Sequence, residues 1–403
     1  MSRGSVFRLL LVSLLLCVAQ TAFGCLWDMD TLANEAKGLP DVVQVITGRF
    51  ERNPPLYYEI RLKRVTAGLA KNPTLLEDYD NAGVACDRLS RDDEAIAWMG
   101  KKRVPLQKLD RNSAVGKENW YHYYANIGTF RMLRWLRAGA DRKHIAEMEQ
   151  ARNEIATAIE INPNAHFGRE KVQLAMIAWI VKPTVDLRGK EKTVNFWEYI
   201  ADSDSAEYSQ KLTFHYRSPT GDITQEEWIK GLKGLIVLGD TWESVDTFDT
   251  LAWLLNSNKA TIGYLARLRC QELVTHGRKP LFPDELPLDM VNLYAEKDPG
   301  VYPDHLKGLQ KKYQQLRTES EEWQQRRTDY MMVRLQAGRH PDTDTAFWND
   351  WQDDGPPNMD MPGEGRNPNF EAELFLWIVL GFLVVSSVIA IIWWRRRRVR
   401  RGP

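Results

Sequence analysis

Apolar residues recur at helical spacing through most of the chain, and short turns containing Asn, Pro or Gly separate the segments that carry them. Residues 32–50 and 56–70 show this pattern on either side of Asn53-Pro54-Pro55. A spacing of three or four places apolar residues on one face of a helix. Because runs with the alternation of a strand are few, the pattern predicts an all-α fold of amphipathic helices.

Two further segments form a helix pair with a tight turn between them. The first follows Pro73 and runs to about Leu89, and the second runs from Asp93 to about Arg103, before Pro105. Helix, turn and antiparallel helix make an αα-hairpin, whose apolar face needs a neighbouring hairpin to cover it. We therefore expect stacked antiparallel helical hairpins.

This hairpin resembles the tetratricopeptide repeat (TPR), a helical hairpin of 34 residues. Tyr79 and Gly83 match the aromatic and glycine positions of its first helix. Ala95 follows Gly83 by twelve residues, at the small position of the second helix. Neither Gly83 nor Ala95 has bulk, so the two helices are expected to approach closely there. Pro105 departs from the pattern, since it comes two residues before the proline that usually ends a repeat.

A second unit resembles the same repeat, with Tyr124 and Gly128 at its opening. Its second helix carries small, large and proline residues at the repeat's spacings, namely Ala151, Ile155, Ala158, Ile161 and Pro163. The separation of Gly128 from Ala151 is 23 residues instead of twelve, which predicts an insertion around 134–143. An ordinary amphipathic helix followed by Asn-Pro is the alternative. The resemblance implies a TPR-like α-solenoid with these packing positions: Tyr79, Gly83, Ala95, Tyr124, Gly128, Ala151, Ala158 and Pro163.

Residues 25–32 and 162–171 resemble uncharacterised exported bacterial TPR-like proteins. The resemblance covers about residues 25–180, which we take as the N-terminal repeat domain. It names no activity, and what it implies is a concave surface of stacked hairpins that binds a protein or peptide.

Residues 181–225 interrupt the helical pattern. Residues 211–217 alternate between apolar and polar, and residues 218–222 form a strong turn signal, so a small β-hairpin or an ordered loop is expected in this insertion. A capping sequence at Thr224 then opens a C-terminal helical region, residues 226–338.

The last part of that region predicts one long amphipathic helix. Leu309, Leu316, Trp323 and Tyr330 recur every seven residues. Two interpretations are open, a coiled-coil seam and an apolar stripe packed on the repeat array. Residues 339–372 follow and are rich in Asp, Pro, Gly and Asn, which predicts a flexible acidic linker.

The two ends of the chain indicate export and a membrane anchor. Residues 1–24 combine arginines, an apolar stretch and a small-x-small cleavage site, which is typical of a signal peptide. Residues 373–394 form an apolar segment whose 21 uncharged residues would rise about 31 Å as a helix, and six arginines follow in residues 395–403.

These segments predict a single-pass membrane protein with its N-terminal domain outside the cytoplasm, in the bacterial periplasm, and its C-terminus in the cytoplasm. A buried core helix and a processed C-terminal sorting signal are the alternatives for residues 373–394. Lipidation of Cys25 is an alternative to ordinary cleavage.

Charge and cysteine content exclude some classes of function. The chain has 54 basic and 54 acidic residues, and the part between the ends is close to neutral apart from the acidic linker. Nucleic-acid binding needs a basic surface, so no nucleic-acid partner is expected. Cys25, Cys86 and Cys270 are too few for a disulfide framework. One Cys25–Cys86 bridge and buried free thiols are both open, as is the oligomeric state.

No catalytic, metal-binding or phosphate-binding motif is recognisable in the sequence. The seven histidines are scattered, without a second ligand at metal-binding spacing. Asp28 and Asp30 resemble the paired aspartates of phosphotransfer enzymes, but a cleavage site precedes them where those enzymes have a buried strand. We therefore predict a non-enzymatic protein without catalytic residues, metal or cofactor.

Aromatic residues offer an alternative role to core packing, because Tyr and Trp dominate binding hot spots. Five residues are the candidates for contact with a partner: Trp120, Tyr121, Tyr123, His166 and Arg169. The predicted function is a membrane-anchored scaffold of the cell envelope that binds a protein or peptide. The alternative is an envelope hydrolase or transferase with its site around residues 181–225.

Overall fold

The computed structural model describes residues 26–163, 168–187, 190–201, 215–216, 223–256, 259–298 and 300–358, together with Pro219, Gly221 and Asp360. Most of these residues are helical, so the all-α prediction is confirmed at that level. The helices follow one another in this order: α2 (Met29–Lys37), α3 (Val42–Thr47), α4 (Pro55–Lys71), α5 (Leu76–Arg88), α6 (Asp92–Leu106), α7 (Ala114–Arg137), η1 (Arg142–His144), α8 (Ala146–Ile161), α9 (Arg169–Val181), α10 (Phe196–Ile200), α11 (Gln225–Val237), η3 (Thr241–Glu243), α12 (Val245–Asn256), α13 (Ala260–Thr275), α14 (Leu288–Glu296) and α15 (Pro303–Gln336).

Local sequence sets where several of these helices begin. Pro55 is the first residue of α4, where its missing N–H has no intrahelical partner to lose. At α11, the Thr224 side chain accepts a hydrogen bond from the Glu227 N–H, and Glu227 accepts one from the Thr224 N–H. This reciprocal capping box is the one that the sequence predicted.

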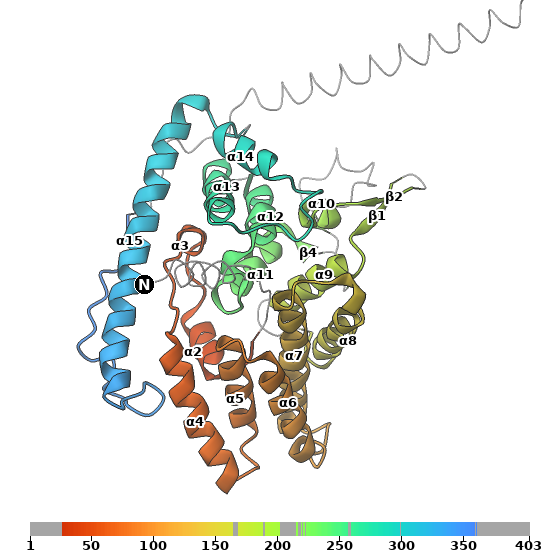
Figure 1. Ribbon diagram of the computed structural model, residues 1–403, viewed down its shortest axis with the longest axis vertical. Coiled ribbons are helices and arrows are strands. Elements are labelled where there is room, and N and C mark those ends of the chain that lie inside the picture. The colour runs from red at the N-terminus through yellow and green to blue at the C-terminus, as the bar shows by residue number, and fades with distance from the viewer. Residues whose placement is uncertain are drawn as a thin grey trace, which may run out of the picture.

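The helices from α4 to α9 pack each against the next along the chain. They form a curved layer that runs from the orange to the olive part of Figure 1. From α9 the chain passes to α11, α12 and α13, which also pack in order. One continuous apolar core extends from Leu26 to Leu316, so these helices share a single interior.

Two glycines allow the closest helix contacts in this layer. A Cβ at Gly83 would lie 2.9 Å from Phe130 and 3.1 Å from Met99, and a Cβ at Gly128 would lie 2.9 Å from Ile155. Such distances are shorter than ordinary van der Waals contact, so α5 and α7 need glycine at these points. The small packing positions Ala95, Ala151 and Ala158 are also fully buried.

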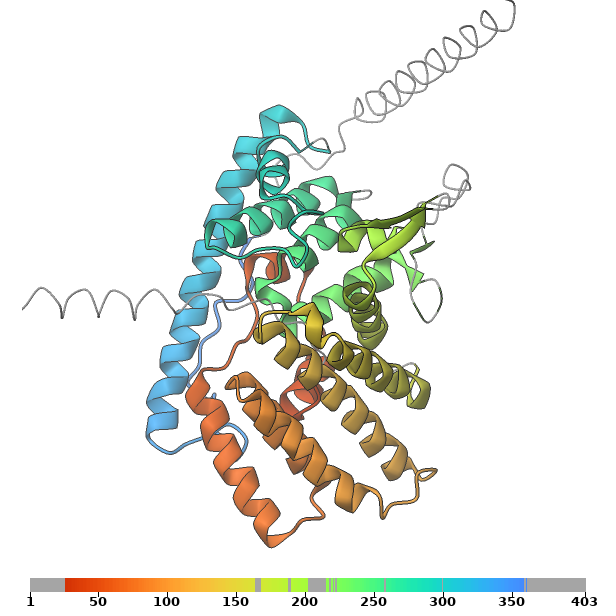
Figure 2. The same ribbon diagram turned by 45° about the vertical axis from the view of Figure 1, so that its right-hand side comes forward.

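The long helix α15 closes the array by contacting its beginning. It packs against α13, which precedes it, but also against α3 and α4 near the N-terminus. Both ribbon views place it along one side of the molecule (Figures 1 and 2). Its buried face, which includes Leu309, Leu316 and Trp323, therefore lies on helices of its own chain.

The first half of the predicted acidic linker differs from that expectation. After α15 ends, residues 340–358 turn back and follow the same helix, as the dark blue segment beside α15 shows in Figure 1. Phe347 is fully buried with Tyr57, Met331 and Leu335. Acidic side chains of this segment pair with arginines of the folded body, which is why it does not behave as a spacer. We call residues 340–358 the C-terminal strap.

The insertion between α9 and α11 holds two short antiparallel ladders. Strands β1 (Thr184–Leu187) and β2 (Lys190–Thr193) pair with Thr184 opposite Thr193. Strands β3 (His215–Tyr216) and β4 (Ile223–Thr224) flank the predicted turn, with Tyr216 opposite Ile223. Residues 202–214, which belong to the stretch assigned to an alternative enzyme site, lie outside the described part of the chain.

The predicted localisation as a single-pass membrane protein is corrected by the structure. Among the described residues, no helix is both long enough and apolar enough to cross a bilayer. α15 has the length, with 34 residues, but charged side chains occur all along it. The segments on which the prediction rested, residues 1–24, 373–394 and 395–403, lie outside the described residues, and so does Cys25.

Candidate functional site

The first described residues are fixed by a helix from the middle of the layer. The Asn126 side chain accepts a hydrogen bond from the Trp27 N–H at 2.7 Å and donates one to the Trp27 carbonyl at 3.0 Å. The Trp27 ring stacks on His122, with ring centres 4.8 Å apart. These contacts hold the chain against α7, and Asp28 and Asp30 point toward Arg61 of α4.

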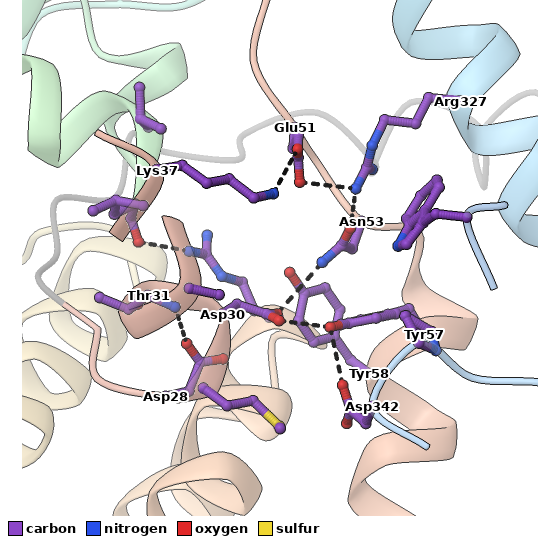
Figure 3. A pocket seen from close by; sticks show the side chains of 17 residues that line it. Asp28, Asp30, Thr31, Lys37, Glu51, Asn53, Tyr57, Tyr58, Arg327 and Asp342 are labelled. Carbon is purple, nitrogen blue, oxygen red and sulfur yellow. Dashed lines mark hydrogen bonds and ion pairs between the residues drawn. The ribbon is translucent and has the colours of Figure 1, made fainter. Parts of the chain in front are cut away.

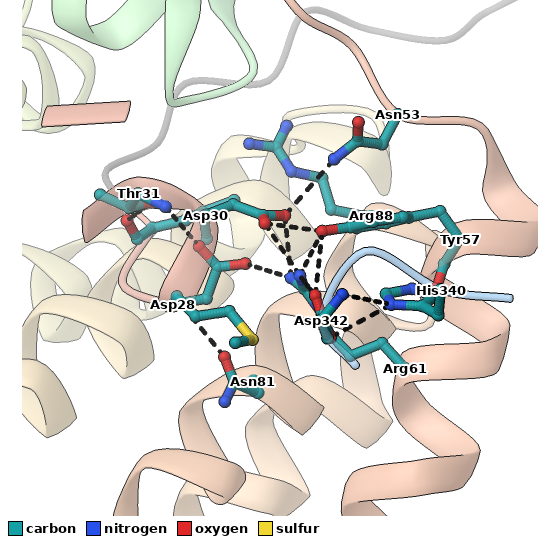
Figure 4. Close-up of polar contacts among 12 residues, drawn as sticks. Asp28, Asp30, Thr31, Asn53, Tyr57, Arg61, Asn81, Arg88, His340 and Asp342 are labelled. Carbon is teal, nitrogen blue, oxygen red and sulfur yellow. Dashed lines mark hydrogen bonds and ion pairs between the residues drawn. The ribbon is translucent and has the colours of Figure 1, made fainter. Parts of the chain in front are cut away.

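Arg61 of α4 is the centre of the site, and its side chain is fully buried. It forms paired hydrogen bonds with both oxygens of Asp30, each at 2.8 Å. It forms a second pair with Asp342 of the strap, at 2.8 and 2.6 Å, and a single bond with Asp28 at 3.1 Å (Figure 4). One guanidinium therefore joins the start of α2, α4 and the strap, and we call Arg61, Asp28, Asp30 and Asp342 the Arg61 cluster.

Burial and charge act in opposite directions on the acids of this cluster. Burial, reinforced by the neighbouring charge of Asp30, raises the pKa of Asp28 to about 6. Burial would also raise the pKa of Asp342, but the hydrogen bonds and charge of Arg61 lower it below its usual value. The pKa of Arg61 is raised well above its usual value despite burial, because Asp342 and Asp30 stabilise the charged form.

His340 and Tyr57 complete the cluster on the side of the strap. The Nδ1 atom of His340 accepts a hydrogen bond from the Asp342 N–H at 3.1 Å, and its Nε2 lies 3.0 Å from the Tyr57 carbonyl. Burial lowers the pKa of His340, so the neutral ring with its proton on Nε2 fits both contacts. The Tyr57 hydroxyl donates to Asp30 at 2.6 Å, and burial raises its pKa.

A cavity of about 330 Å³ opens beside the cluster, between α2, α4, α15 and the strap. Lys37 and Glu51 form an exposed ion pair at 3.2 Å near its mouth. Glu51 also pairs with Arg327 of α15 at 3.2 Å, and Arg327 donates to Asn53 at 3.1 Å (Figure 3). The walls therefore carry charges of both signs, with each charge held by a neighbour.

A second cavity of about 370 Å³ adjoins the first, since Lys37, Glu51 and Val237 line both. Arg49 and Trp323 lie on its far wall. The two cavities together form a depression along the inner side of α15, which we call the α15 groove.

The acids and bases of the Arg61 cluster are already engaged with one another. The thiols at Cys86 and Cys270 are buried, and burial raises the pKa of Cys86 to about 12 and that of Cys270 well above its usual value. Within the described part of the chain, no three His, Cys, Asp or Glu side chains are placed to hold a metal ion.

The aromatic residues expected to contact a partner lie inside the helical layer. Trp120, Tyr121 and Tyr123 are buried, because α7 is covered by α5, α6 and α8. The Tyr121 hydroxyl donates to Glu170 at 2.8 Å. Arg169 is also buried and faces the Trp27 ring. None of these side chains lines the α15 groove, and His166 lies outside the described residues.

The remaining packing positions have structural contacts of their own. The Tyr79 hydroxyl donates to the Pro73 carbonyl at 3.1 Å, and Tyr124 stacks on Trp120. Pro163 lines a separate cavity between α8 and α9.

Sequence reasoning missed the centre of the Arg61 cluster and part of the lining of the α15 groove. Asp28 and Asp30 were noticed, but Arg61, Asp342 and Arg49 were not. The excess of acidic residues after α15 could have indicated them, because acidic residues of a folded segment need basic partners in the rest of the chain.

Comparisons of the chain with protein-family models, curated proteins and solved structures found no match. A function must therefore be assigned from the geometry of the Arg61 cluster and the α15 groove. Together they form a depression on the helical array, and its charged side chains, of both signs, are already oriented by their ion pairs.

Proposed function

We propose that this chain is a helical scaffold of the TPR-like type that binds a protein or peptide partner and does not catalyse a reaction. The observation that carries the proposal is the α15 groove, two adjoining cavities lined by charged groups that are already oriented by ion pairs. Oriented groups lose little conformational freedom when a ligand binds, so more of the contact energy appears as affinity.

Two features support the repeat part of the proposal. Consecutive helices pack in chain order, as in quasi-one-dimensional repeat arrays. Gly83 and Gly128 occupy close helix contacts at the positions where the resemblance places them. The closure by α15 is a departure from an open solenoid, and it is what creates the groove.

The chemistry of the groove suits an extended peptide. Lys37 and Glu51 offer charges of opposite sign at the mouth, and Asn53 can donate and accept hydrogen bonds with a peptide backbone. Tyr58 and Trp348 add aromatic surface. This combination of aromatic and polar groups is typical of peptide-recognition sites.

The proposal predicts that reversing one charge at the mouth weakens binding. Peptides would be selected from a displayed random library against the purified full-length chain. Calorimetry would then compare the wild type with Lys37→Glu, which places a negative charge beside Glu51. We expect affinity to fall about tenfold, or about 1.4 kcal/mol.

Lys297→Glu is the matched control, because Lys297 is also exposed but lies beyond α14, outside the groove. It should leave the affinity unchanged. Equal affinity of the selected peptides for both variants would show that the groove is not their binding site, and failure to select any peptide would contradict the proposed function.

A further inference from the structure

The C-terminal strap follows a row of basic side chains that belong to other parts of the fold. Along it, Asp350 pairs with Arg334 at 3.2 Å, Asp353 pairs with Arg49 at 3.2 Å, and Asp354 pairs with Arg326. An acidic segment is thus matched, residue by residue, to a basic strip on α15 and the α3–α4 connection. This match is a charge complementarity between a peptide segment and a surface.

The two halves of the strap are held very differently. The inner half is anchored by His340 and Phe347, which are buried, and by Asp342, whose side chain is 4 % exposed. In the outer half, the side chains of Asp350, Asp353 and Asp354 are 82, 51 and 64 % exposed. Ion pairs whose acid is exposed to water are weakened by solvent and salt, so the outer half can separate from α15 while the anchor stays in place.

Asp353 occupies the most specific position on the strip. The Arg49 guanidinium stacks over the Trp323 ring at 4.4 Å and donates hydrogen bonds to the Asp353 carboxylate at 3.2 Å and the Gly355 carbonyl at 2.5 Å. The Trp323 indole N–H donates to the same carboxylate at 3.1 Å. Arg49 itself is buried, with 7 % of its side chain exposed, so this carboxylate clamp is rigid.

Space for a ligand adjoins the clamp. The second cavity of the α15 groove, about 370 Å³, is lined by Arg49, Trp323, Asp353 and Phe50. A peptide that entered from the Lys37 end would therefore meet the clamp where the strap now lies.

We infer that the strip formed by Arg49, Trp323, Arg326 and Arg334 recognises an extended acidic segment of a partner protein, and that the outer half of the strap occupies the same strip in the free chain. The inference rests on the proposed function and names the chemical class of its partner. In this arrangement the strap competes with the partner. The apparent affinity is reduced by the fraction of molecules in which the strip is covered.

Competition makes a directional prediction for the full-length chain. A fluorescein-labelled peptide with the sequence of residues 348–357 would be titrated with wild type and with the double variant Asp353→Ala, Asp354→Ala, with anisotropy as the readout. We expect the double variant to bind the peptide at least tenfold more tightly, because its own strap no longer fills the clamp. A peptide with its three aspartates replaced by asparagine should bind at least tenfold more weakly to the same variant.

Two further variants control the comparison. The pair Asp284→Ala, Asp289→Ala removes two exposed acids outside the strap and should leave affinity at the wild-type value. Adding Arg326→Gln and Arg334→Gln to the strap variant should abolish the gain, since both arginines pair with strap acids at the surface. Melting curves by circular dichroism would verify that every variant is folded.

The inference is overturned if the strap variant binds the peptide no better than wild type, or if the arginine variant keeps the gain. Dimerisation of the strap variant in light scattering would also overturn it, because a second copy of the chain would then be the occupant. None of these outcomes affects the binding of library peptides that depends on Lys37. The proposed function is therefore tested separately from this inference.

Discussion

Arg61 shows how single residues organise this protein. Its buried guanidinium is shared by two carboxylates from the first described residues and one from the strap, so it acts as a junction between chain segments. A buried charge is tolerated only when its partners are in place, and removing one partner leaves the others unpaired. The cluster is therefore a point where stability and the shape of the groove depend on the same atoms.

The first prediction concerns this junction. Arg61→Met should lower the free energy of unfolding by about 3–5 kcal/mol, since it leaves Asp28, Asp30 and Asp342 close together without a counterion. Urea denaturation monitored by circular dichroism would measure the change. Arg64→Met is the control, because Arg64 also pairs with Asp342 but is 36 % exposed, and it should lower that free energy by less than about 1 kcal/mol. Equal effects of the two variants would contradict the central role of Arg61.

A second prediction concerns Asp246 of α12. Burial raises the pKa of its carboxyl group to about 7, although the hydrogen bond that it accepts from the Leu281 N–H at 2.9 Å acts to lower that pKa. In the unfolded chain its pKa is near 3.9, so the folded state binds more protons between about pH 4 and pH 7. The free energy of unfolding should therefore decrease as pH rises through that interval.

Asp246→Asn tests this dependence, because the amide resembles the protonated acid and can still accept the Leu281 hydrogen bond. The variant should be more stable than wild type at pH 8 and similar to it at pH 4, in urea denaturation at both values. Asp289→Asn is the control at an exposed position, and it should leave the free energy of unfolding unchanged at both pH values. A variant that is less stable than wild type at pH 8 would show that the Asp246 carboxylate is stabilising in its charged form.

At the scale of the elements, close contacts between helices depend on where glycine leaves room for a neighbouring helix. α7 crosses α8 at Gly128, where the Ile155 side chain and the Ala151 carbonyl lie within 3.1 Å of a Cβ position. α6 contains a glycine of the opposite kind, since a Cβ at Gly100 would meet nothing within 4 Å. A glycine-to-alanine substitution should therefore change the free energy of unfolding in opposite directions in the two helices.

The third prediction uses this contrast. Gly128→Ala should lower the free energy of unfolding by about 1–3 kcal/mol, because the added methyl group overpacks the contact with α8. Gly100→Ala should raise it by about 0.5–1 kcal/mol, because alanine loses less conformational freedom in a helix. Thermal and urea denaturation of both variants would measure the difference. If Gly128→Ala left the free energy of unfolding unchanged, α7 and α8 could move apart at this contact without loss of stability.

At the scale of the whole molecule, α15 and the strap determine where a partner can bind. Arg317 of α15 donates to the Thr47 carbonyl at 2.7 Å and pairs with Glu272 of α13 at 2.9 Å, so α15 joins both ends of the array. The α15 groove lies along this seam. Without the closure, Arg49 and Trp323 would not face each other, and no carboxylate clamp would exist.

Local patterns were sufficient for several parts of this fold. Apolar spacing predicted the helices, Thr224 and Glu227 predicted the start of α11, and β3 and β4 pair on either side of the turn signal that follows Tyr216. The aromatic positions on α7 show the limit of such patterns. Trp120 and Tyr121 looked suitable for a partner, but the neighbouring helices cover them.

The sequence by itself determined the helical class, because the spacing of apolar residues along one helix depends on side chains three or four residues apart. The tertiary structure decided the site. Arg61 and Asp342 are separated by 281 residues, and Arg49 and Asp353 by 304. No periodicity links positions so distant, and only the packing of α15 against α3 and α4 brings those charges within hydrogen-bonding distance.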